Sequence, residues 1–120
     1  MARRIFVFGS NLAGRHGAGA AKTAREQYGA VQGTFAGRTG DAYAIPTKDT
    51  EFRPRSLGAI EVYVNDFIQY ALDNPHLIFD VTRLGCGLAG YTDEQIAPMF
   101  AGSPANVILP KAWGGEGFDW

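Results

Sequence analysis

The chain has 120 residues, 46% of them hydrophobic and 19% charged, which indicates one globular domain over residues 1–120 rather than a disordered segment. Its 11 basic and 12 acidic residues give a net charge of -1, without the basic excess typical of proteins with an extended nucleic-acid surface. The single cysteine, Cys86, excludes an internal disulfide and a cysteine-based zinc finger. No apolar run approaches the ~20 residues of a membrane helix, and the stretch 5–8 is too short for a secretory signal. We therefore expect a cytoplasmic protein with no membrane partner.

Seven segments alternate between strand and helix patterns along the chain. The predicted order is a strand over residues 3–8, a helix over 18–28, a strand over 42–45, a helix over 56–73, a strand over 77–81, a helix over 92–100 and a strand over 106–109. We expect Pro46 to end the second strand, and Ser56 and Thr92 to cap the helices that follow them. The alternation predicts a three-layer α/β/α sandwich with a mixed or mostly parallel sheet.

Two predictions concern packing. Residues of the long helix recur at helical spacing on one face, which is expected to meet the core. These residues are Ile60, Val64, Phe67, Ile68, Ala71 and Leu72. The tail 111–120 is rich in glycine and aromatic residues, and we expect it either to dock on the domain or to be flexible.

The 16 glycines are an unusual share of the chain, against about 7% in average proteins, and many gather in two loops. The loops 9–19 and 85–90 each follow a predicted strand and lead into a predicted helix. Ligands of open α/β folds bind at the carboxyl ends of strands, and the first N–H groups of a helix attract anions. Because two such loops can meet at one crevice, we favour an anionic or nucleotide ligand over a purely structural role. The spacing excludes a P-loop, and it is a weak match to the dinucleotide fingerprint.

Three segments carry a resemblance to a known family. The run 8–11 (FGSN) with 17–21 (GAGAA) looks like an asparagine-bearing strand end and its glycine-rich loop. The run 45–48 (IPTK) looks like a strand end that bears a functional lysine, and 82–88 (TRLGCGL) looks like a second diphosphate loop. Together they resemble a macrodomain, the ADP-ribose-binding α/β/α module. The likeness is greatest to the short branch of terminal ADP-ribose-protein glycohydrolases, and it spans roughly residues 3–110.

The resemblance implies that the ligand is ADP-ribose or a related nucleotide, free or attached to a macromolecule. By the same resemblance, Asn11 would contact the distal ribose, and residues 17–19 and 85–88 would enclose the diphosphate. From the two loops and the resemblance together, the candidate ligand-binding residues are Gly9, Ser10, Asn11, His16, Gly17, Ala18, Gly19, Arg83, Gly85, Cys86, Gly87, Leu88, Ala89, Gly90 and Tyr91.

Catalysis is a separate question. In the glycohydrolase branch a lysine attacks the anomeric carbon of the ribose, and an acidic residue just after the Gly-Cys-Gly-Leu run assists. Lys48 matches the lysine, whereas Ala89 stands where the acid is expected. Asp93 is the nearest replacement, so Lys48 and Asp93 are the candidate catalytic residues. Three interpretations stay open: an ADP-ribosyl glycohydrolase, a non-catalytic sensor or sequestering protein for a nucleotide signal, and an unrelated α/β enzyme with Cys86 or Lys48 as nucleophile.

Single residues of the loops allow further expectations. His16, among Arg15 and glycines, is expected to be exposed, either as a ligand contact or as an idle surface histidine. Arg83 either pairs with Asp80 or reaches a ligand phosphate. The Cys86 thiol is expected to pack beneath its loop, and Tyr91 either stacks on the ligand or packs in the core. No His, Cys and carboxylate residues share a metal-binding spacing, so neither a metal nor a cofactor is expected.

Overall fold

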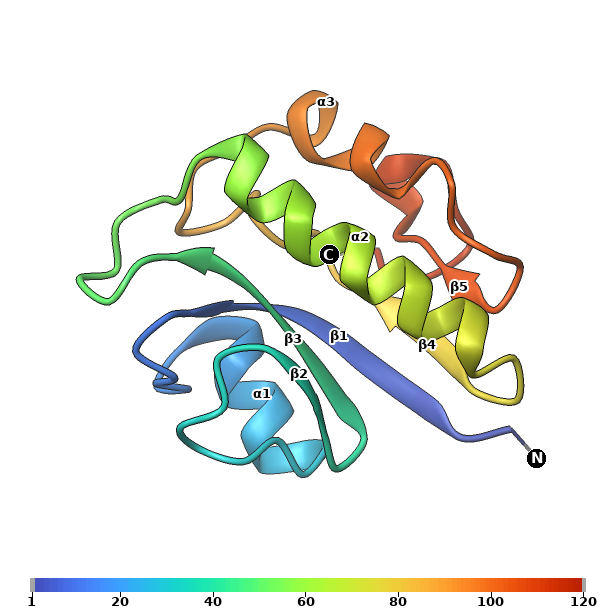
Figure 1. Cartoon of the computed structure of the whole chain (residues 1–120), viewed down its shortest axis with the longest axis horizontal. Coiled ribbons are helices and arrows are strands. Elements are labelled where there is room, and N and C mark those ends of the chain that lie inside the picture. Colours follow the sequence, from blue (N-terminus) through green and yellow to red (C-terminus); the bar gives the residue numbers. More distant parts are fainter. Residues whose placement is uncertain (1, 120) are drawn as a thin grey trace.

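A mixed five-stranded sheet in the order β2-β3-β1-β4-β5 runs through the middle of the protein, with helices on both faces (Figure 1). The computed structural model describes residues 2–119. Its elements are β1 (Arg4–Asn11), α1 (Gly19–Gln27), β2 (Gly37–Thr39), β3 (Ala42–Lys48), α2 (Leu57–Asp73), β4 (Ile78–Val81), α3 (Asp93–Ile96), η1 (Ala97–Phe100), β5 (Val107–Ile108) and η2 (Lys111–Trp113). Strands β3, β1, β4 and β5 are parallel, and only β2 runs antiparallel to its neighbour β3. The predicted α/β/α sandwich is confirmed.

Strand β1 lies at the centre of the sheet and is buried on both faces. Ile5 and Val7 belong to the larger core cluster beneath α2, and Phe6 and Phe8 belong to the smaller cluster beneath α1. The other buried residues of the smaller cluster are alanines, two of them on α1, so that this helix packs closely over the two phenylalanine rings. A strand covered on both faces needs a continuous apolar run, which is the pattern of residues 5–8.

Strand β3 is longer than predicted, because it runs through Pro46 to Lys48. Its antiparallel partner β2 pairs only with residues 42–44, so no strand forms backbone hydrogen bonds with the outer side of β3 at position 46. Proline is tolerated at such an edge position because its missing N–H is not required there. The expectation that Pro46 ends the strand is therefore wrong. The extension carries Lys48 to the carboxyl end of β3, in register with Asn11 of β1.

Helix α2 begins as predicted, since the Ser56 hydroxyl accepts a hydrogen bond from the Ala59 N–H (3.2 Å). The residues of its predicted face that are fully buried are Ile60, Val64, Phe67 and Ala71. Leu72 is 52% exposed, so its assignment to the core is wrong. Each residue of a helix is rotated by about 100° from the one before it, and the buried stripe of α2 is too narrow to include the neighbour of Ala71.

The third helix also departs from its predicted length. Its start is tied by the Thr92 N–H, which donates to Gln95 Oε1 (2.9 Å). The α-helical part, α3, ends at Ile96 and continues as the 3₁₀ turn η1. The cause is Pro98, which lacks the N–H needed to continue the helical ladder.

The C-terminal residues contact both core clusters. The Trp113 ring lies 5.3 Å from the Phe100 ring on the α3 side, and the Phe118 ring lies 5.8 Å from the Phe6 ring on the α1 side. The Gly117 N–H donates to the Leu109 carbonyl (2.9 Å), so the tail also bonds next to the edge strand β5. Met1 and Trp120 lie outside the described residues. Within residues 2–119, no helix has the length and apolar character needed to cross a bilayer.

Candidate functional site

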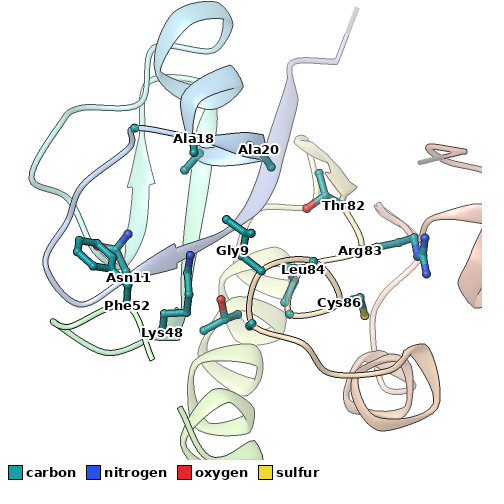
Figure 2. A pocket seen from close by; sticks show the side chains of 18 of the residues that line it. Gly9, Asn11, Ala18, Ala20, Lys48, Phe52, Thr82, Arg83, Leu84 and Cys86 are labelled. Carbon is teal, nitrogen blue, oxygen red and sulfur yellow. The ribbon is translucent and has the colours of Figure 1, made fainter. Parts of the chain in front are cut away.

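A cavity of about 640 Å³ opens at the carboxyl ends of β1, β3 and β4 (Figure 2). Its volume falls in the range of ~300–1,000 Å³ typical of small-molecule sites. Its walls come from both glycine loops, from the end of β3 and from the turn after it. The lining residues are Gly9, Asn11, Arg15, Gly17, Ala18, Gly19, Ala20, Ala21, Thr47, Lys48, Phe52, Thr82, Arg83, Leu84, Gly85, Cys86, Gly87, Leu88 and Ala89. The structure therefore brings most of the predicted ligand-binding residues together around one space.

The charged residues of this lining are all basic. Arg15, Lys48 and Arg83 line the cavity, and no aspartate or glutamate does. Within residues 2–119, Arg83 pairs with Asp93, while Arg15 and Lys48 have no carboxylate within ion-pair distance. In a chain with a net charge of -1, this concentration of unpaired cations favours an anionic ligand.

The amino-terminal end of α1 adds backbone donors to the same wall. The first N–H groups of any helix have no partner within the helix, and Ala18 at the cap position has no side-chain oxygen to bind them. Residues 17–21 line the cavity, and Figure 2 shows Ala18 and Ala20 along one side of it. A Cβ atom added at Gly17 or Gly19 would meet nothing within 4 Å. A ligand can therefore approach this backbone closely.

Asn11 lies at the end of β1, where it is buried and has both ends of its amide engaged. Its Nδ2 donates to the Arg15 carbonyl (2.9 Å), and its Oδ1 accepts from the Arg15 N–H (3.1 Å). The side chain therefore closes the loop that carries Arg15 on the cavity wall. Its predicted contact with a ribose stays a prediction.

His16 and Ser10 lie behind the loop, outside the cavity lining. The His16 ring is fully buried, lies edge-on to the Phe8 ring at 5.5 Å, and donates from Nε2 to the Thr34 carbonyl (2.9 Å). The Ser10 hydroxyl donates to the Phe35 carbonyl (2.5 Å). The expectation that His16 is exposed is therefore wrong. The polar segment 32–35 folds back over this loop and supplies the burial, which the composition around His16 does not reveal.

The second glycine loop contains one glycine that packs against a helix and one that faces open space. Gly85 has a φ of +79°, and a Cβ atom there would lie 3.0 Å from Ile96 Cδ1, so this glycine allows the loop to pack on α3. Gly87 faces open space. Neither Gly90 nor Tyr91 lines the cavity. The Tyr91 hydroxyl instead donates to the Arg55 carbonyl, which ties the end of the loop to the start of α2.

A cluster around Asp93 holds this loop from outside the cavity. The Asp93 carboxylate accepts from Arg83 Nε (3.0 Å) and Nη2 (2.7 Å) and from Trp113 Nε1 (2.6 Å). The hydrogen bonds from Arg83 and then Trp113 lower the pKa of Asp93 to about 2. Asp80, the other partner considered for Arg83, is bound by Arg4 (2.6 Å and 2.8 Å). In Figure 2 the Arg83 side chain points away from Lys48.

The two candidate reactive groups of this loop are thus poorly suited to acid or nucleophilic chemistry. Asp93 does not line the cavity, and a carboxyl with a pKa of about 2 holds no proton to donate near neutral pH. Burial, followed by the charge of Asp93, raises the pKa of Cys86 to about 11, so its thiol is protonated. No group of three or more His, Cys, Asp or Glu residues within residues 2–119 could hold a metal.

Comparisons with known proteins concern the fold. No family model matches the sequence, and no curated protein does either. The macrodomain of Mycobacterium tuberculosis DarG is similar, with a TM-score of 0.66 and 19% identity over 90% of this chain and 88% of that one. The fold is macrodomain-like. A protein of unknown function from Bacteroides thetaiotaomicron is also similar, with a TM-score of 0.61 and 15% identity over 91% of this chain and 87% of that one.

Within residues 2–119, seven residues of the cavity lining are not among the predicted ligand-binding or catalytic residues: Arg15, Ala20, Ala21, Thr47, Phe52, Thr82 and Leu84. Phe52, in the turn directly after Lys48, lines the cavity although it is 47% exposed. The sequence offered one signal for this residue, because Phe52 is an aromatic residue in a charged turn close to the candidate functional residue Lys48. Figure 2 shows that the Lys48 side chain runs beside this turn with its amine directed toward the Ala18 side of the cavity.

Proposed function

We propose that the cavity binds ADP-ribose or an ADP-ribose-derived nucleotide, with the diphosphate between residues 17–19 and 85–88. The observation that carries this proposal is the uncapped end of α1, which opens onto a cavity lined by cations and by no carboxylate. Backbone N–H groups at a helix N-terminus favour phosphate oxygens. The macrodomain-like fold and the resemblance of both loops to macrodomain motifs support ADP-ribose as the particular anion.

The sugar beyond the diphosphate is proposed to lie beside Asn11 and Lys48. These residues pair in register at the ends of β1 and β3, and both line the cavity. An amide and an ammonium group can together donate to several hydroxyl oxygens. Free ADP-ribose and ADP-ribose attached to a macromolecule both remain candidate ligands.

Calorimetric titration with ADP-ribose, ADP and inorganic pyrophosphate tests this proposal. We expect ADP-ribose to bind most tightly, because only it reaches both the phosphate-binding loops and the Asn11–Lys48 side. Pyrophosphate is expected to bind most weakly of the three. A protein to which ADP-ribose does not bind, or binds no better than pyrophosphate, would contradict the proposal.

Of the roles left open, we favour a non-catalytic sensor or sequestering protein. Cleavage of an ADP-ribosyl bond needs a proton donor for the leaving group, and no carboxyl group of residues 2–119 lines the cavity. The nearest candidate, Asp93, accepts hydrogen bonds from Arg83 and Trp113 instead. A cytoplasmic location stays a prediction alongside this role.

Slow hydrolysis through Lys48 is the second candidate, supported by the position of the lysine in the cavity lining. Attack by its free amine on the anomeric carbon would break the bond between that carbon and the modified residue, which leaves with a proton from the attacking nitrogen, and would form a covalent lysyl adduct that water then hydrolyses to free ADP-ribose and lysine. Intact mass spectrometry after incubation with an ADP-ribosylated protein tests this role, with the Lys48→Ala variant as the control. An adduct together with released ADP-ribose, both abolished by Lys48→Ala, would establish the glycohydrolase role, whereas tight binding with no adduct and no released ADP-ribose would establish the sensor.

A further inference from the structure

The turn 49–53 places an aromatic ring at the mouth of the cavity. It begins directly after Lys48, and it is anchored at its far end by an isolated bridge between Lys48 and Pro54. Lys48 is in register with Asn11, so the turn borders the side of the cavity where we place the distal ribose. Phe52 lines the cavity from this turn, and the residue is 47% exposed.

The backbone of Phe52 is in an unusual conformation. Its φ is +64°, and no other residue of 2–119 apart from glycines has a positive φ. Bulky L-residues rarely adopt this region. Backbone strain of this kind persists where the surrounding structure fixes it, and it gathers at ligand sites.

Asp49 fixes the turn. Its Oδ1 accepts from the backbone N–H groups of Glu51 (2.8 Å) and Arg53 (3.0 Å), and its Oδ2 accepts from Arg53 Nε (3.2 Å). The Asp49 N–H in turn donates to the Arg53 carbonyl (2.8 Å). The ring of Phe52 is therefore held at the mouth by a rigid turn rather than by packing in a core.

A second apolar side chain lines the same cavity from the other glycine loop. Leu88 is 78% exposed. Exposed apolar side chains on two separate walls suit a ligand that presents an apolar face at the mouth, whereas the polar and cationic groups suit its phosphates and hydroxyls. An aromatic ring offers its face to a flat ring of the ligand.

We propose that Phe52 is a stacking platform for a planar ring that the ligand carries beyond its distal ribose. This inference rests on the proposed function and narrows it to a ligand class. The ligand is an ADP-ribose derivative with a heterocycle at the anomeric carbon of the distal ribose. Because Arg15 and Lys48 leave unpaired positive charge on the cavity lining, an uncharged heterocycle fits better than a cationic one.

The test compares the affinities of ADP-ribose and NADH, which is ADP-ribose with an uncharged planar ring at that carbon. Stacking on an aromatic residue is expected to make NADH bind about 5- to 20-fold more tightly to the wild type. In Phe52→Gly this ratio should fall to about 1, because the affinity for NADH should fall by more than the affinity for ADP-ribose. Glycine relieves the positive φ, so the thermal midpoint of this variant should not fall.

Two further variants make the test specific. Phe52→Trp should keep the preference for NADH, because it keeps a flat aromatic face. Phe35→Ala is the matched control, since Phe35 is 42% exposed and lies outside the cavity lining, and it should leave the ratio unchanged. The stacking role of Phe52 would be contradicted if the wild type bound the two ligands equally, or if Phe52→Gly kept the full preference for NADH. Neither result would contradict the proposed ADP-ribose site. Failure of ADP-ribose to bind at all would instead overturn the proposed function.

Discussion

The two glycine loops that face each other across the cavity are built in different ways. The loop after β1 ends at an uncapped nine-residue helix, and it presents backbone donors to the cavity. The loop after β4 leads into a four-residue helix, and it is held from outside by side chains, through Arg83 to Asp93 and Tyr91 to Arg55. The two loops are both rich in glycine but differ in what they offer a ligand. The loop after β1 offers electrostatic attraction through its backbone N–H groups, and the loop after β4 forms a fixed wall on the opposite side of the cavity.

Glycines also differ within each loop. Gly17 and Gly87 have nothing within 4 Å of where a Cβ would lie, whereas Gly14 and Gly85 lie against Gly33 and Ile96. The first pair is available to a ligand, and the second pair allows close packing. This difference can be tested by substitution, and the largest expected effect comes from the open pair.

Gly17→Val and Gly87→Val should each block the approach of a ligand from one side of the cavity. We expect each to lower the affinity for ADP-ribose about 100-fold, or about 2.8 kcal/mol, with the thermal midpoint nearly unchanged. Gly102→Val is the matched control, because position 102 is also open and lies outside the cavity lining. Full affinity in both loop variants would contradict the placement of the diphosphate.

Gly85→Ala should instead lower the stability of the fold. Its φ of +79° and the 3.0 Å distance from a Cβ to Ile96 Cδ1 predict a loss of stability of about 1–3 kcal/mol. Gly87→Ala should change the free energy of unfolding by less than about 0.5 kcal/mol. Denaturant unfolding of the two variants measures the difference. Equal stabilities would show that the loop does not depend on its packing against α3.

Asn11→Ala separates a ligand contact from a structural role in the first loop. Loss of an unreplaced hydrogen bond to the distal ribose should weaken ADP-ribose binding by about 1–3 kcal/mol and leave ADP binding unchanged. If Asn11 acts only by closing the loop at Arg15, the affinities for both ligands should fall equally, since both reach that loop. Titration of the variant with both nucleotides distinguishes the two outcomes.

The smallest effect concerns the outer support of the second loop at low pH. The hydrogen bonds from Arg83 and Trp113 lower the folded-state pKa of Asp93 from its usual 3.8 to about 2. Ionised Asp93 therefore stabilises the fold above pH ~4, and this contribution is lost as the pH falls from about 4 to about 2. Asp93→Asn should flatten that part of the curve of unfolding free energy against pH. Identical slopes for the variant and the wild type would show that the cluster contributes nothing to stability.

Much of the fold was predictable because it depends on neighbours in sequence. The apolar run 5–8 predicts a strand buried on both faces, and Ser56 predicts the start of α2 through a hydrogen bond three residues away. The glycine loops at the carboxyl ends of two strands likewise predict one ligand crevice, since parallel strands end at the same edge of the sheet.

The sequence by itself thus determined the order of the elements apart from the short strand β2, the α/β/α class and the crevice between the two glycine loops, because hydrophobic period, capping and turn chemistry act over a few residues. The tertiary structure alone decided the roles of single polar and aromatic side chains. His16 is buried because segment 32–35 covers it, the pKa of Asp93 is lowered because Arg83 and Trp113 reach it, and Phe52 lies at the cavity because β3 carries its turn to the edge of the sheet where β1 ends. Each of these outcomes depends on the environment that distant residues or an unusual backbone angle create around a side chain, and a local sequence pattern does not encode that environment.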